Sequence, residues 1–255
     1  MARLPYIGEC GILGNMTLRI LVLIAAVLQI PAAGILGAGT FETGVREWPV
    51  FIQPAGWAFS IWGFIYVAAL AFAIYQIIPK NDNQTLRAVR VPALIAFLGS
   101  IVWLYFAGAN DWTVWVTIPT LFVMAGALTV VVMQPKLSAS WPELFSRSLL
   151  LPYAAWTGIA QWLNIQVLLS DQGFITSGAL NTATNVGILL CLAAYTLYFL
   201  RRSGYSIWYG GVIIWASIAV IAANTGTPDG SIIIATMAGA LGLAAMALIR
   251  QNAQV

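Results

Sequence analysis

The sequence predicts an all-α integral membrane protein with eight transmembrane helices and both termini on the cytoplasmic side. Of its 255 residues, 61% are hydrophobic and only 7% are charged, whereas a soluble domain carries roughly 25% charged residues. The apolar residues come in runs of about 20, the length that an α-helix needs to cross the hydrocarbon core of a bilayer. The basic residues gather at alternate ends of these runs.

Uninterrupted apolar runs favour helices, because backbone in lipid must satisfy its own hydrogen bonds and barrel strands would show alternating segments of about ten residues. We expect residues 1–16 to remain on the chain as a short cytoplasmic leader. The expected helices are, in order, Thr17–Gly39, Ala55–Ile78, Val91–Ala109, Thr113–Gln134, Ser148–Leu169, Leu180–Leu200, Ser206–Asn224 and Ser231–Ile249.

The positions of the basic residues support an even number of spans. With eight spans, only Arg46 falls on one side of the membrane, and the other ten basic residues share the opposite side. These ten are Arg3, Arg19, Lys80, Arg87, Arg90, Lys136, Arg147, Arg201, Arg202 and Arg250. The side that carries the Lys and Arg excess is the cytoplasmic one. The net charge of +3 therefore reflects orientation in a membrane, and we expect membrane lipid rather than nucleic acid as a partner.

Several classes of chemistry find little support in the sequence. The chain has no histidine, which removes the commonest metal ligand and the usual general base. Cys10 precedes the first span and Cys191 lies within another, so we expect no disulfide. Apart from Arg19, no charged residue lies inside the expected spans, although ion-coupled transporters usually bury such residues. We therefore assign no catalytic residue and no metal site, and an enzyme is the least supported class.

Large aromatic residues mark two of the spans. Phe59, Trp62 and Tyr66 are spaced i, i+3, i+7, which places them on one face of the second helix. Tyr153, Trp156 and Asn164 share a broad face of the fifth in the same way. Two interpretations remain open. Such rings can be structural, packed between helices or placed at the membrane interface, or they can line a pocket for a flat apolar ligand.

Two motifs resemble the TspO/MBR family of tryptophan-rich sensory and translocator proteins. Leu151-Pro152-Tyr153-Ala-Ala-Trp156 with Leu163-Asn164 is similar to the signature of the family's fifth helix. Pro54, Trp57, Phe59, Trp62 and Tyr66 resemble its second-helix motif. The chain departs from the family at Gln53, where a basic residue is usual, and at Ser100-Ile-Val-Trp103, where the family has Asn-x-x-Trp.

The resemblance implies a five-helix bundle over residues 17–169, to which residues 170–255 add three helices. It also implies a receptor or carrier for a porphyrin, another tetrapyrrole or a sterol-like lipid, with no required cofactor. The pocket would open to the non-cytoplasmic side, with the loop Thr40–Pro54 as its lid. The implied ligand-binding residues are Gln53, Trp57, Phe59, Trp62, Tyr66, Ser100, Trp103, Tyr153, Trp156 and Asn164.

Two other functions stay open. The added helices, and a stripe of small residues formed by Ala235, Gly239, Gly242 and Ala245, are also typical of an accessory subunit in a homodimer or a larger pigment–protein complex. A transporter is compatible with eight spans but has no internal repeat to support it. For Asn164, Asn181, Asn185 and Asn224, the alternative to a role in ligand binding is that they simply bond neighbouring helices. The expected location is a bacterial cytoplasmic (inner) membrane or a thylakoid membrane.

Overall fold

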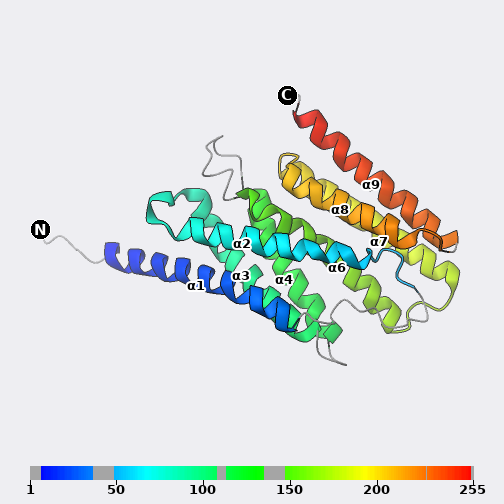
Figure 1. Cartoon of the computed structure of the whole chain (residues 1–255), viewed down its shortest axis with the longest axis horizontal. Coiled ribbons are helices and arrows are strands. Elements are labelled where there is room, and N and C mark those ends of the chain that lie inside the picture. Colours follow the sequence, from blue (N-terminus) through cyan, green and yellow to red (C-terminus); the bar gives the residue numbers. More distant parts are fainter. Residues whose placement is uncertain (1–6, 37–48, 108–112, 135–146, 228, 254–255) are drawn as a thin grey trace, which may run out of the picture.

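The computed structural model describes residues 7–36, 49–107, 113–134, 147–227 and 229–253. Within these ranges the chain is helical, with no strand, and Figure 1 shows the helices lying side by side as one elongated bundle. The α-helices are α1 (Ile7–Leu36), α2 (Ile61–Ile77), α3 (Gln84–Ala107), α4 (Thr113–Met133), α6 (Leu151–Asp171), α7 (Gly178–Arg202), α8 (Ile207–Asn224) and α9 (Asp229–Ala253). Two short 3₁₀ helices, η1 (Gly56–Ser60) and η2 (Pro79–Asn81), flank α2.

Each expected span contains a helix, and the largest differences lie at two helix starts. Helix α1 begins at Ile7 rather than Thr17, within the expected leader, and α3 also begins early. This helix begins at Gln84 rather than near Val91, because the side chain of Asn83 accepts a hydrogen bond from the backbone N–H of Leu86 at 2.8 Å. A side-chain acceptor at this position satisfies one of the free N–H groups at a helix start. Arg87 and Arg90, which we expected in the preceding loop, therefore belong to the helix.

Helix α6 lies at the centre of the bundle, where α4, α7 and α8 pack against it. Every residue from Leu151 to Ile159 is buried. Seven of the described helices are long and apolar enough to cross a membrane, and α6 is not among them. Gln161, Asn164 and Gln166 lower the mean hydropathy of α6. A helix of this composition fits here because α4, α7 and α8 pack around it.

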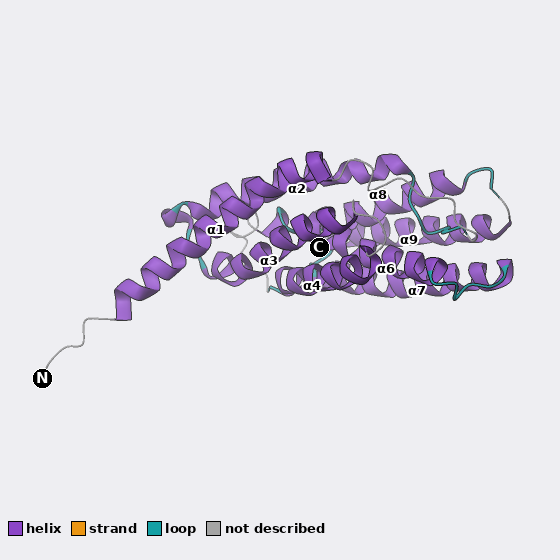
Figure 2. Cartoon of the chain, turned by 90° about the horizontal axis from the view of Figure 1, so that it is seen from below, coloured by secondary structure: helices purple, strands orange, loops and turns teal. Residues whose placement is uncertain are grey.

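The buried apolar side chains of the described residues join into a single cluster that runs through the whole bundle. Figure 2 shows α1 to α3 toward one end of the molecule and α7 to α9 toward the other. Gly239 and Gly242 lie against Ile221 and Ser217 of α8, so this part of the small-residue stripe packs inside the chain. The division of the chain at residue 169 stays a prediction.

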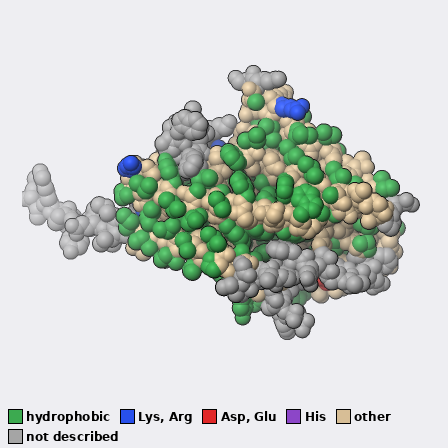
Figure 3. Space-filling view, in the orientation of Figure 1, with side chains coloured by type: hydrophobic (Ala, Val, Ile, Leu, Met, Phe, Trp, Pro, Cys, Tyr) green, Lys and Arg blue, Asp and Glu red, His purple; other side chains and the backbone are tan. Residues whose placement is uncertain are grey.

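The outer surface fits a hydrocarbon environment. In Figure 3 the visible face is covered mainly by apolar side chains, and the visible Lys and Arg side chains lie at its left and upper margins. Large apolar side chains such as Val67, Trp115 and Leu243 are about 60% exposed or more, which in water would be unfavourable at this density. The protein is an all-α integral membrane protein.

Candidate functional site

An extended segment before α2, residues 49–55, crosses the ends of α7 and α8, and we call it the strap. The Asn181 amide donates to the carbonyl oxygen of Pro49 at 3.0 Å. The backbone N–H of Ile52 donates to Oδ1 of Asn185 at 3.2 Å. The Asn224 amide donates to the carbonyl oxygen of Phe51 at 2.8 Å.

The three asparagines are 6% exposed or less, and their partners differ from those we expected. The Nδ2 of Asn185 donates to the backbone and side-chain oxygens of Asn181, each at 2.9 Å, which leaves its Oδ1 facing the strap. A fourth bond, from the N–H of Ala55 to the carbonyl oxygen of Ala219 at 3.0 Å, completes the attachment. The asparagines thus hold a loop onto the helices rather than one helix onto another.

A cavity of about 50 Å³ lies beneath the strap. Its walls come from the strap, from the first five spans and from α7, α8 and α9. The strap contributes Ile52 and Pro54. The first five spans contribute Phe59, Trp62, Trp103, Trp156, Ile159, Ala160, Leu163 and Asn164. The remaining wall comes from α7, α8 and α9 and consists of Leu189, Leu192, Thr196, Ile213, Ala216, Ser217, Val220, Ala238 and Leu241.

Five of the ten predicted site residues line this cavity, and four of them are aromatic. The indoles of Trp62 and Trp103 stack with centroids 5.8 Å apart. Phe59 meets Trp156 edge to face, also at 5.8 Å. The fifth, Asn164, donates from Nδ2 to the carbonyl oxygen of Ala160 in its own helix.

Three predicted residues, Tyr66, Ser100 and Tyr153, lie behind the indole of Trp62 and do not line the cavity. The Tyr66 hydroxyl and Oγ of Ser100 are 3.2 Å apart, within hydrogen-bonding distance. The Tyr153 hydroxyl donates to the carbonyl oxygen of Ala96 at 3.1 Å and lies 3.3 Å from Oε1 of Gln29. Sequence reasoning missed Gln29, although a lone glutamine in the middle of an apolar span was a usable signal.

The other two predicted residues, Gln53 and Trp57, lie outside the cavity. Gln53 belongs to a turn of the strap, where its backbone N–H donates to the carbonyl oxygen of Val50. Trp57 is 46% exposed and meets Trp215 edge to face at 4.8 Å. Trp215 in turn donates from Nε1 to the carbonyl oxygen of Ala58, which ties η1 to α8.

The indole N–H groups of Trp62 and Trp156 find no hydrogen-bond acceptor among the described residues. Both side chains are more than nine-tenths buried, at 6% and 2% exposure, and both line the cavity. A buried donor without an acceptor costs about 1–3 kcal/mol. Two residues of the cavity wall therefore carry buried N–H groups that lack an acceptor among the described residues.

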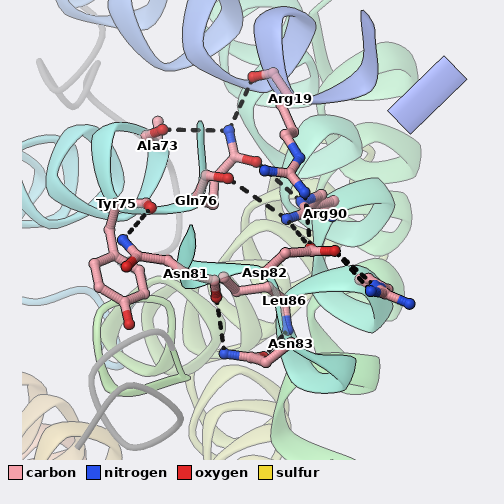
Figure 4. A network of polar contacts seen from close by, with 10 residues as sticks. Arg19, Ala73, Tyr75, Gln76, Asn81, Asp82, Asn83, Leu86 and Arg90 are labelled. Carbon is pink, nitrogen blue, oxygen red and sulfur yellow. Dashed lines mark hydrogen bonds and ion pairs between the residues drawn. The ribbon is translucent and has the colours of Figure 1, made fainter. Parts of the chain in front are cut away.

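A second polar cluster lies far from the cavity, where α1, α3 and the end of α2 meet (Figure 4). Asp82 forms ion pairs with Arg19 at 3.0 Å, Arg87 at 2.8 Å and Arg90 at 2.6 Å. Gln76, which is fully buried, accepts a hydrogen bond from Nε of Arg90 and donates to the carbonyl oxygen of Arg19.

The charges around Asp82 set its protonation. Burial acts to raise the pKa of the Asp82 carboxyl, but hydrogen bonds from Arg90 and Arg87 and the positive charges of Arg90 and Arg19 outweigh burial and hold it below its ordinary value. The cluster links the first three helices at this end of the bundle. It contains none of the predicted site residues.

The fold and the cavity together define a helical membrane protein with an aromatic internal site. A family model described as "TSPO-like protein" matches residues 13–249. The chain belongs to this family, which confirms the resemblance, and the match extends through α7, α8 and α9. No curated protein and no solved structure matches the chain.

Proposed function

We propose that the protein is a membrane receptor or carrier that binds a flat, largely apolar ligand in the cavity beneath the strap. The observation that supports this function best is the pair of buried indole N–H groups of Trp62 and Trp156 beside an apolar cavity. A ligand with an oxygen acceptor at its edge would pair these donors while its apolar body contacts the rings. A tetrapyrrole such as a porphyrin, or a sterol-like lipid, has this chemistry.

The size of the cavity sets a condition on binding. Its 50 Å³ is far below the roughly 300–1,000 Å³ of typical small-molecule sites. A ligand of tetrapyrrole size therefore binds only if the walls move apart, and the free energy of that separation lowers its affinity. The strongest binding belongs to a ligand that recovers this free energy through the two indole donors.

The proposal includes an eight-span topology in a bacterial cytoplasmic membrane or a thylakoid membrane, with both ends of the chain on the cytoplasmic side. The basic residues Lys80, Arg147, Arg202 and Arg250 of the described helices and loops fit this orientation under the positive-inside rule. Helix α6 is counted as a span because its neighbours, rather than lipid, surround it. The cavity then lies toward the non-cytoplasmic side, where α2 begins.

Fluorescence quenching tests the function. The purified protein in lipid nanodiscs is titrated with protoporphyrin, and quenching of tryptophan emission is expected to saturate. Trp156→Phe is expected to weaken binding by about tenfold, the effect of losing one hydrogen bond of about 1.4 kcal/mol. The matched control is Trp115→Phe, because Trp115 is 62% exposed on α4 and does not line the cavity. Quenching that never saturates, or that is equal in both variants, would contradict the proposal.

The alternative of an accessory subunit has less specific support. Part of the small-residue stripe that motivated it packs on α8. Absorption and mass spectra of whatever co-purifies in mild detergent distinguish the two functions, since a stoichiometric protein partner favours a subunit and a bound pigment or lipid favours a receptor.

A further inference from the structure

The cavity is firmly covered at the end where α2 begins. The strap forms four hydrogen bonds with α7 and α8, and three of them have a buried asparagine as donor or acceptor. Its Ile52 and Pro54 are buried and form part of the cavity wall. Passage at this end requires several of these bonds to break together.

A different opening lies on the lipid-facing side, between α2 and α8. It is an open groove of about 500 Å³, ten times the volume of the cavity. Its walls include Ile61 and Phe64 of α2 and Trp208 and Val212 of α8. The rings of Phe64 and Trp208 stack across it with centroids 6.2 Å apart, and each is 47% exposed.

The groove and the cavity lie on neighbouring faces of the same two helices. Along α2, Ile61 faces the groove and the next residue, Trp62, faces the cavity. Along α8, Val212 and Trp215 line the groove, and the residues that follow each of them, Ile213 and Ala216, line the cavity. Side chains of α2 and α8 therefore contribute to the walls of both spaces.

This wall also has little helix packing behind it. Among the described helices, α9 packs closely on α7 and α8, and α6 packs on both of them, whereas the only α-helix that α2 packs closely on is α1. The hydrogen bonds that join η1 and the strap to α8 lie at one end, where Ala55 bonds to Ala219 and Trp215 bonds to Ala58. Beyond η1, α2 can move away from α8 without breaking either bond.

We propose that the ligand of the cavity passes directly between the bilayer and the cavity through this seam between α2 and α8, and not past the strap. The inference rests on the proposed function and specifies its route. The occupant of the groove is the apolar ligand in transit, because α2 and α8 are both apolar enough to span a membrane and the groove between them opens toward acyl chains. Separation of α2 from α8 also enlarges the cavity, which the ligand needs.

A cleavable cross-link across the seam tests the route. Phe64→Cys and Trp208→Cys are combined in a protein in which Cys10→Ser and Cys191→Ser remove the native thiols. The protein in nanodiscs is loaded with protoporphyrin, and the two cysteines are then bridged with a short bis-methanethiosulfonate. Release into an excess of empty liposomes is followed by the recovery of tryptophan fluorescence, before bridging, after bridging and after reduction. Each single-cysteine variant treated with the same reagent is the control.

Bridging is expected to slow release by about tenfold or more, an added barrier of about 1.4 kcal/mol, and reduction is expected to restore the original rate. Asn185→Ala, which loosens the strap, is expected to leave the release rate within about twofold, because the strap is not on the route. Unchanged release after bridging, or faster release in Asn185→Ala, would overturn the route while leaving binding intact. Absence of saturable loading before any bridging would instead overturn the proposed function, and the route with it.

Discussion

The indole of Trp62 stacks on that of Trp103, with centroids 5.8 Å apart and planes 29° apart. Trp62 also stacks on Tyr66 at 5.5 Å and meets Tyr153 edge to face at 5.7 Å. One side chain thus connects α2, α3 and α6, and it also lines the cavity. The packing interpretation of these aromatic residues therefore holds for Trp62, and the ligand-binding interpretation stays a prediction.

Because three helices meet on Trp62, its removal affects stability as well as any bound ligand. Trp62→Ala is expected to lower the free energy of unfolding by about 3–5 kcal/mol, as for other large-to-small changes in cores. Unfolding in mixed micelles of increasing SDS content measures the change. Trp115→Ala, on an exposed part of α4, serves as the control and is expected to change it by less than about 0.5 kcal/mol. Equal losses in the two variants would show that Trp62 does not hold the helices together.

The Asp82 cluster predicts loss of stability in acid. Because the pKa of Asp82 is lowered in the folded protein, its stabilisation is present above the unfolded pKa of about 3.9 and disappears as the pH falls through the folded pKa. Asp82→Asn is expected to cost about 3 kcal/mol at neutral pH, since it leaves buried Arg90 without a carboxylate, and to abolish this acid dependence.

Arg87→Gln is the matched control for this prediction. Arg87 bonds the same carboxylate, but its side chain is 66% exposed, and exposed pairs contribute about 0–1 kcal/mol. Melting curves of the wild type and the two variants between pH 3 and 7 (a range around the ordinary carboxyl pKa of about 4) measure the effect. A melting curve of Asp82→Asn with the acid dependence of the wild type would contradict the assignment.

The asparagine attachment of the strap predicts a local change in accessibility. Ile52→Cys places a thiol where the native side chain is 5% exposed, so a membrane-impermeant maleimide is expected to label it slowly. Adding Asn185→Ala removes the acceptor for the backbone of residue 52 and is expected to speed labelling by about tenfold, which corresponds to one lost hydrogen bond. Adding Thr184→Ala instead, at a residue that bonds only within α7, is expected to leave labelling unchanged. Slow labelling in both double variants would mean that Asn185 does not hold the strap.

A glycine in α6, Gly158, lies against a side chain of α7. A Cβ atom on Gly158 would lie 2.7 Å from a ring carbon of Tyr195, and that ring packs on Trp162 and Phe199. Gly158→Ala is therefore expected to cost about 1–3 kcal/mol by overpacking. Gly187→Ala on α7, where nothing lies within 4 Å, is expected to be neutral or stabilising by up to about 1 kcal/mol. Unfolding of the two variants in SDS compares them directly, and a neutral Gly158→Ala would show that α6 and α7 lie further apart.

The sequence predicted the helices well because apolar run length depends only on the thickness of the bilayer. Phe59, Trp62 and Trp156 line one cavity; helical spacing could predict a shared face for Phe59 and Trp62, whereas their grouping with Trp156, on another helix, followed from the family resemblance. Helical spacing could not show that Tyr66 and Tyr153, on the same faces, would lie behind Trp62. Their depth depends on which rings stack on which, and this is a property of the assembled bundle.

The wall formed by α7, α8 and α9 could not be predicted in the same way. Residues such as Leu192, Ile213 and Leu241 are ordinary apolar residues of a membrane helix, and they line the cavity only because α6 packs on both α7 and α8. Asn181, Asn185 and Asn224 did stand out as polar residues in apolar helices. Their partners are backbone groups of the strap, about 130–170 positions away along the chain, and spacing rules such as those for helix faces do not reach that far.

In the proposed topology, the composition of α6 has a consequence for biogenesis. Gln161, Asn164 and Gln166 make this segment a poor substrate for release from the translocon into lipid by itself. The nascent chain must then keep α6 beside the insertion machinery until α7 and α8 have been synthesised and can shield it. A ribosome that stalls just after α6 would leave this helix outside the bilayer, and the binding site would never form.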